Sequence, residues 1–236
     1  MRKSELIFEN PGRKIFLTDE PEKFIYEFND QETFHDGEQV ASFDRKGETN
    51  LKIAAAIFRE LERKNVQTHF IRENLDTRME TVAIKMFPVR VIVRNAVGPG
   101  YTARSELNPG DALPVTLVEF KLSDNVSSTG VTQEGRRYLF TEINEGQIKL
   151  IYVRSLEINK KLKPFFEKCG LIAADFALEF GQGTNGEIIL AGAISPDNCT
   201  LWNKDTSEKI DKTRFMKPLR NSIEDLESIM KRLGSI

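Results

Sequence analysis

Asp175 and Glu179 are the residues whose types and spacing most directly suggest chemistry. They lie in the segment 171–180, where alternate side chains of a predicted strand share a face, so that Asp175, Ala177 and Glu179 point to one side. At about 3.3 Å per residue the two carboxylates lie about 13 Å apart, which is too far for both to ligate one ion. The spacing suits one carboxylate at a metal ion near phosphate groups and the other at a second ligand. A solvated strand face whose acids have no role is the competing interpretation, and the spacing alone favours it.

The segment Asn10-Pro11-Gly12-Arg13-Lys14 is a second candidate, because it sets a glycine turn beside two cations. Backbone N–H groups of such a turn, together with Arg13 and Lys14, could cradle a phosphate group. The segment lacks the spacing of a P-loop, so a charged hairpin turn is the favoured interpretation.

Asp197 and Arg94 each follow a predicted strand and could contact a ligand there. Asp197 comes directly after Pro196, and an acid in a proline turn is either a ligand contact or ordinary turn chemistry. Arg94 precedes Gly98-Pro99-Gly100, where the backbone can approach a ligand closely. Its guanidinium could fork onto a carboxylate or a phosphate, or form a surface ion pair. Both alternatives stay open for both residues.

Hydrophobic periodicity predicts the elements that position these residues. Strands are predicted at 6–8, 14–17, 24–28, 81–94, 171–180 and 187–194, and helices at 47–65, 144–168 and 223–233. We expect Thr49 to cap the first helix, and Pro164 to kink or end the second. An Asn-Gly pair at 185–186 predicts a hairpin between the last two strands. Residues 123–142 are predicted to form an irregular loop of the kind that covers active sites.

The composition is that of a reduced, cytoplasmic protein with a large core. The chain has 236 residues, of which 39% are hydrophobic, enough for one compact unit or two closely packed lobes. Its 34 basic and 36 acidic residues give a net charge of -2, so we expect no nucleic-acid or membrane partner, although a local phosphate pocket is compatible with it. Cys169 and Cys199 lack the spacing of a metal pair or a disulfide framework, and His35 and His69 are isolated. No apolar run approaches the roughly 20 residues of a membrane span.

The order of these weak signals resembles that of the SAICAR synthetase family over almost the whole chain. The resemblance rests on the segments 46–53, 68–70, 87–95, 117–120, 175–181, 194–197, 201–202 and 209–212. It implies an α+β fold of two lobes with ATP between them. The first lobe, residues 1–85, would be an antiparallel nucleotide-binding sheet, and the second, residues 86–236, an α/β lobe.

The resemblance also implies a reaction. Members of this family use ATP and Mg²⁺ to phosphorylate the carboxylate of a phosphoribosyl-aminoimidazole, and the amine of aspartate then displaces the phosphate. It further implies small-molecule substrates, a cytoplasmic location and a possible homodimer.

The family pattern assigns expected roles to particular residues of this chain. Lys14 and Arg13 would face the ATP phosphates, Glu179 would hold Mg²⁺, and Lys212 would lie near the nucleotide. Arg94 would line the region of the acceptor and aspartate, with Asp175 and Asp197 as the catalytic acids. These roles require a cleft that brings Lys14 of the first sheet close to Glu179 of the later hairpin.

Several positions depart from the family pattern. The pattern has lysines where this chain has Gly12 and Ala177, and an acidic pair where it has Gly192 and Ala193. It has an aspartate at the position of Ser128 and an arginine at that of Thr200. Loss of a carboxylate from a metal–phosphate site removes several kcal/mol of transition-state stabilisation. The sequence therefore predicts a divergent ATP-dependent ligase, acting on the parent substrates or on an altered pair. The alternative is a catalytically inactive relative that binds a nucleotide or a protein partner.

Overall fold

An antiparallel sheet forms the N-terminal part of the protein. The computed structural model describes residues 1–10, 12–34, 39–74, 77–98, 107–108, 110–122, 140–204 and 223–234. The first sheet has the order β1-β2-β3-β7-β6. Its strands are β1 (Lys3–Asn10), β2 (Arg13–Thr18), β3 (Lys23–Phe28), β6 (Phe70–Glu73) and β7 (Arg78–Val82). The three predicted strands at its beginning are confirmed as a meander, and a short hairpin of β4 (Gln31–Phe34) and β5 (Gln39–Ser42) follows it.

A second antiparallel sheet forms the C-terminal part. It has the order β11-β10-β8-β9, and β12 pairs with the other half of the long strand β10. Its strands are β8 (Lys85–Ala96), β9 (Ala112–Leu122), β10 (Leu171–Gln182), β11 (Ile188–Ala191) and β12 (Cys199–Asn203). The predicted hairpin is confirmed, with Gln182 opposite Ile188. Strand β8 runs unbroken through Pro88.

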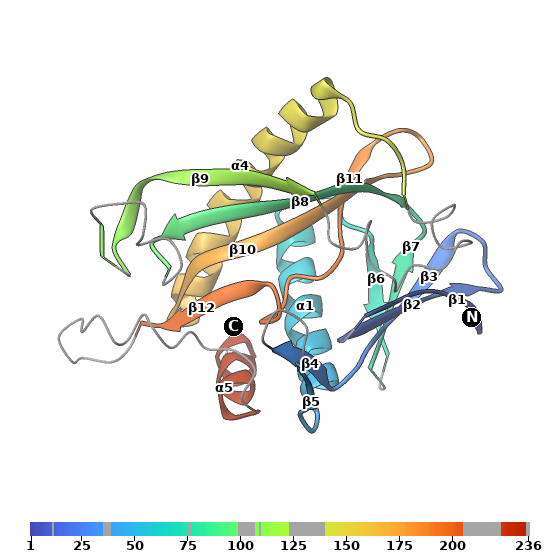
Figure 1. The fold of residues 1–236 in the computed structure, drawn as a ribbon, viewed down its shortest axis with the longest axis horizontal. Helices are drawn as coiled ribbons and strands as arrows, with labels where there is room; N and C mark the ends of the chain where they lie inside the picture. The colour runs from blue at the N-terminus through green and yellow to red at the C-terminus, as the bar shows by residue number, and fades with distance from the viewer. Residues whose placement is uncertain are drawn as a thin grey trace.

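Helix α1 (Lys46–Arg63) lies between the two sheets (Figure 1). The expectation that Thr49 caps it is wrong, because the residue before the helix is Arg45, in a left-handed conformation, and the Thr49 hydroxyl donates to the Arg45 carbonyl from within the first turn. The helix start is held from outside instead: the Gly47 N–H donates to Asp30 Oδ1 over 2.8 Å. This contact joins the helix to the segment that leads into β4.

Helices α4 (Glu145–Lys168) and α5 (Ile223–Leu233) complete the described part. A capping box between Asn144 and Gln147 starts α4 as sequence chemistry favours. Pro164 does not end α4, which continues to Lys168, and the two residues directly after the proline, Phe165 and Phe166, are buried in the core. None of the described helices has the combination of length and apolar composition that a membrane span requires.

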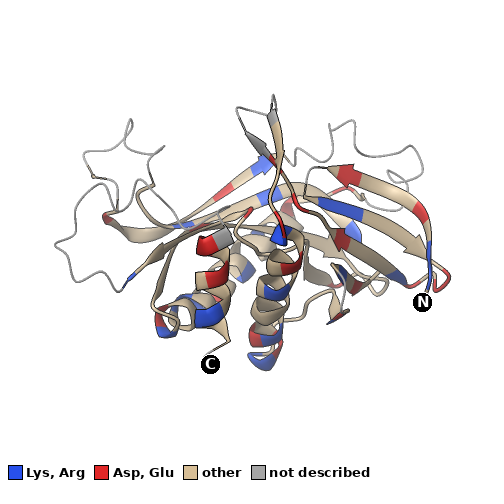
Figure 2. Ribbon diagram, turned by 90° about the horizontal axis from the view of Figure 1, so that it is seen from below, with Lys and Arg blue, Asp and Glu red and all other residues tan. Residues whose placement is uncertain are grey.

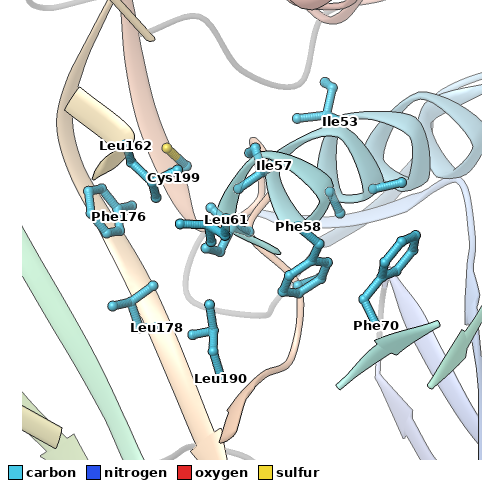
Figure 3. Packing of buried hydrophobic residues seen from close by; sticks show 14 of the residues in the cluster. Ile53, Ile57, Phe58, Leu61, Phe70, Leu162, Phe176, Leu178, Leu190 and Cys199 are labelled. Carbon is cyan, nitrogen blue, oxygen red and sulfur yellow. The ribbon is translucent and has the colours of Figure 1, made fainter. Parts of the chain in front are cut away.

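One hydrophobic core joins the two sheets. Figure 3 shows residues of α1 facing side chains of the second sheet and of α4, and one cluster also includes buried residues of β1, β2 and β3. The fold is therefore α+β, with the change of sheet falling between β7 and β8. The division into lobes 1–85 and 86–236 remains a prediction, since the core is continuous across that boundary. Figure 2 shows acidic and basic residues interspersed along the helices and strands.

Candidate functional site

Arg13 and Glu179 join the first sheet to the second. The guanidinium Nη2 lies 3.6 Å from Glu179 Oε2, and the two side chains are only 15% and 11% exposed. Arg13 also lies over the rings of Phe8 and Tyr26, at 5.6 and 5.2 Å from the ring centres, a cation–π arrangement that keeps it in place. Its buried Nε has no hydrogen-bond partner among the described residues, so the guanidinium retains an unused donor.

Lys14 does not take the position expected for it. Adjacent residues of a strand point to opposite faces, and the Lys14 ammonium pairs with Glu9 Oε1 at 2.7 Å on the other side of β2. The expectation that Lys14 lies close to Glu179 is therefore wrong, and Arg13 takes that place. The assignment of Lys14 to ATP phosphates remains a prediction.

Gly192 is the residue that most closely constrains Glu179. Its φ is +70°, and a Cβ added to it would stand 2.1 Å from Glu179 Oε2. The Glu179 carboxylate thus fills the space that a side chain at position 192 would need. Its neighbour Ala193 is buried and contributes only a methyl group. Neither residue therefore supplies the carboxylate that the family pattern has at its position.

His69 holds the backbone of Gly192. The two atoms His69 Nε2 and Gly192 O are 2.9 Å apart, so the ring donates to the carbonyl. Burial between Tyr26 and Phe58 lowers the pKa of His69 to about 3, which keeps the ring neutral near pH 7. These contacts assign His69 to support of the turn that faces Glu179.

Asp197 belongs to a buried ion cluster that sequence reasoning missed. Its Oδ2 lies 2.8 Å from the Lys46 ammonium, which also contacts Glu32 Oε2 at 3.0 Å. Burial and the charge of Asp197 raise the pKa of Glu32. The Asp197 carboxylate also lies against the β1–β2 turn, because Oδ2 is 3.3 Å from where a Cβ of Gly12 would be. The only sequence signal for Lys46 was its place in one of the segments that carry the family resemblance.

Arg94 and Asp175 are cross-strand partners on β8 and β10. Arg94 Nη1 donates to Asp175 Oδ2 over 2.9 Å, and its Nε donates to Glu119 Oε2 over 3.1 Å. The predicted shared face of Asp175 and Glu179 is thus confirmed as a charged face with an arginine at each end. Gly98 approaches the Asp175 end, since its added Cβ would lie 3.8 Å from Asp175 Oδ2.

Comparison with known proteins decides the family. The sequence model described as SAICAR synthetase matches residues 9–233. The chain belongs to the SAICAR synthetase family. It is 33% identical to the phosphoribosylaminoimidazole-succinocarboxamide synthase of Wolinella succinogenes and 36% identical to that of Campylobacter jejuni subsp. jejuni serotype O:23/36, each over 99% of both chains. A solved SAICAR synthetase (Type-2) in complex with ADP superposes with a TM-score of 0.81 at 32% identity, over 98% of both chains. The synthase from Ehrlichia chaffeensis gives 0.81 at 28% identity, over 98% of this chain and 99% of that one.

SAICAR synthetases are ATP-dependent ligases of purine biosynthesis, so the residues of this member can be tested for fit to a magnesium nucleotide. Among the described residues, no three His, Cys, Asp or Glu side chains are grouped closely enough to hold a metal ion. Mg²⁺ bound with a nucleotide commonly takes only one or two protein carboxylates, however, and phosphate oxygens and water supply the rest. Glu179 fits that role, since its contact with Arg13 is longer than a hydrogen bond and can open.

The remaining positions considered from the sequence fall into two groups. Lys212 and Ser128 lie outside the described residues, as does most of the predicted loop 123–142. The other departures are placed: Thr200 stands opposite Asp175 on β12, and Ala177 is buried on the face between the two acids.

Proposed function

We propose that this protein is an ATP-dependent ligase that joins the carboxylate of a phosphoribosyl-aminoimidazole, or of a closely related acceptor, to the amine of aspartate. The observation that carries the proposal is the charged face of β10. Asp175 and Glu179 are both largely buried, and each is paired with an arginine from another strand. Burying an ion pair costs desolvation free energy that the attraction between the charges often does not exceed. Two such pairs on one face therefore indicate a functional site more than a stabilising one.

The face is long enough for two ligands, one at each end. At the Glu179 end, Arg13 would face the ATP phosphates, with Lys212 near the nucleotide. A Mg²⁺ ion held by Glu179 would neutralise charge that develops on the phosphates. At the other end, Arg94 would bind and orient the acceptor beside Asp175.

The reaction then proceeds in two steps. The acceptor carboxylate oxygen attacks the γ-phosphorus of ATP and ADP leaves, which gives an acyl phosphate. The amine of aspartate attacks the acyl carbon and phosphate leaves. Asp197, beside the β1–β2 turn, accepts hydrogen bonds from that amine and receives its proton.

The proposal is tested by turnover. Purified protein with ATP, Mg²⁺, aspartate and the aminoimidazole ribotide carboxylate should release ADP and one equivalent of amide product, and Arg94→Met should abolish the product. Omission of aspartate controls for simple ATP hydrolysis. If no ADP forms with this carboxylate or with a panel of related carboxylates, the ligase proposal is rejected.

A second candidate is a relative that binds a nucleotide without turnover. It is favoured by Gly192 and Ala193, which provide no carboxylate where the family pattern has an acidic pair. Calorimetry separates the two proposals. ADP and ATP binding with no product favours the second, and Mg²⁺-dependent ATP binding accompanied by product rejects it.

We further propose a cytoplasmic homodimer. The free, buried cysteines Cys169 and Cys199 are compatible with a reducing compartment. Ile148 and Tyr152 lie one turn apart on the same face of α4, are 36% and 43% exposed, and would be covered by a second copy. Light scattering that gives the mass of one chain at micromolar concentration would reject the dimer.

A further inference from the structure

Lys46 has the most completely buried charged side chain of the site, with 0% of its surface exposed. It begins α1, and its ammonium contacts acceptors from two other segments. These are Gln31 O at 3.3 Å and Glu32 Oε2 at 3.0 Å, both on β4, and Asp197 Oδ2 at 2.8 Å, in the turn after β11. A buried ammonium is costly unless it is paired and hydrogen-bonded, so these three contacts fix its position.

The turn that carries Asp197 is itself rigid. Ser195 N–H donates to Asn198 Oδ1 over 2.9 Å, Asn198 N–H donates to Ser195 O over 2.9 Å, and the Asn198 side-chain amide donates to Ala193 O. The backbone of residue 197 is therefore held without help from Lys46. What Lys46 adds is the direction of the Asp197 carboxylate.

The two oxygens of that carboxylate are in different situations. Oδ2 is bound by Lys46 and lies against Gly12. Within the described part of the chain, no N–H or hydroxyl group donates to Oδ1, the neighbouring acid is Glu32, and the Asp197 side chain is 30% exposed. A carboxylate with one oxygen fixed and the other open to solvent is preorganised to accept a hydrogen bond from a ligand.

We propose that Lys46 is a positioning residue, which holds Asp197 so that its second oxygen meets the amine of the amino-acid substrate. The inference rests on the proposed ligase function. It adds a residue that touches no substrate and acts through Asp197 alone.

If Lys46 only stabilised the fold, restoring the net charge of the cluster without the ammonium should also restore activity. Lys46 stands between two carboxylates, so the cluster holds one positive and two negative charges. In Lys46→Met, which is close to lysine in size, two neighbouring carboxylates remain without a cation and should destabilise the fold. Adding Glu32→Gln returns the cluster to a single negative charge, but it does not restore the ammonium that directs Asp197.

The experiment compares ligase kinetics and thermal unfolding for the wild type, Lys46→Met, Glu32→Gln and the double variant. Lys52→Met is the matched control, because this lysine lies on the same helix, is 48% exposed and pairs with Glu48. We expect Lys46→Met to lose about 100-fold in kcat/KM for the amino acid, the scale of a 1 Å misplacement of a reacting group. The double variant should unfold at nearly the temperature of Glu32→Gln and still be at least about tenfold impaired. Lys52→Met should match the wild type.

Three results would overturn the inference. If the double variant regains activity together with its unfolding temperature, Lys46 has a structural role only, while the ligase proposal survives. If the wild type shows neither turnover nor amino-acid binding, the ligase proposal fails and the positioning role fails with it. Turnover in Lys46→Met at the wild-type rate is the third contrary outcome, and it also leaves the ligase proposal intact.

Discussion

Gly192→Ala tests the packing of Glu179 against the turn that precedes Asp197. The substituted Cβ would stand 2.1 Å from Glu179 Oε2, so the carboxylate must move away and its contact with Arg13 is lost. Because these charged groups are then poorly paired, the free energy of unfolding should fall by about 2 kcal/mol. The φ of +70° adds about 1 kcal/mol, because only glycine adopts this conformation freely.

The expected total is a loss of about 3 kcal/mol, which corresponds to a fall of about 6–12 °C in unfolding temperature for a chain of this length. A double-mutant cycle adds Glu179→Ala, which removes the carboxylate that obstructs the added Cβ. In that background Gly192→Ala should cost little more than the conformational part, about 1 kcal/mol, because only the Cβ of residue 179 remains, 3.1 Å from the added Cβ. Urea unfolding, with the slope m compared between variants, provides the measurement. Equal costs in the two backgrounds would show that the added Cβ does not meet the Glu179 carboxylate.

Three further predictions concern single residues. Arg13→Met should weaken ADP binding about tenfold or more in calorimetry, whereas Lys14→Met, which removes the same charge from the opposite face of β2, should change it less than twofold; equal losses would contradict the assignment. His69 is buried with its pKa lowered to about 3, so its contribution to stability is fully present above about pH 6.5 and is lost as the pH falls toward 3. The wild type should therefore lose stability more steeply than His69→Gln over that range, and parallel unfolding curves would count against it. Asn159→Leu should cost about 1–3 kcal/mol in urea unfolding, because it removes both 2.8 Å hydrogen bonds between the buried side chains of Asn159 and Asn95 and leaves Asn95 with only its longer bonds to Thr116 and Ala173 O; a neutral effect would mean that the pair does not stabilise the fold.

Strand periodicity predicted much of the fold because it is a local signal. Alternation in residues 171–180 placed Asp175 and Glu179 on one face, and the Asn-Gly pair placed the hairpin. Both features depend only on the period of a strand and on turn chemistry. The start of α1 was predicted to within one residue, but its cap was mispredicted, because the contact that holds the helix start comes from Asp30, which precedes β4, and not from Thr49.

The candidate site was less predictable because it depends on register and on distant partners. Alternate residues of β2 point to opposite faces, so only one of Arg13 and Lys14 can face the second sheet. Which of them does so depends on the β1–β2 turn and on the irregular register between β1 and β2. Lys46 reads as an ordinary exposed lysine at a helix start, since its partner Asp197 is 151 positions away. No local pattern links these residues, and only the folded chain brings them together.

A crystal structure of the protein with ADP would show which end of β10 binds the phosphate groups. We expect them at the Glu179 end, within ion-pair distance of the Arg13 guanidinium. Phosphates bound elsewhere, with the Arg13–Glu179 contact unchanged, would contradict this expectation.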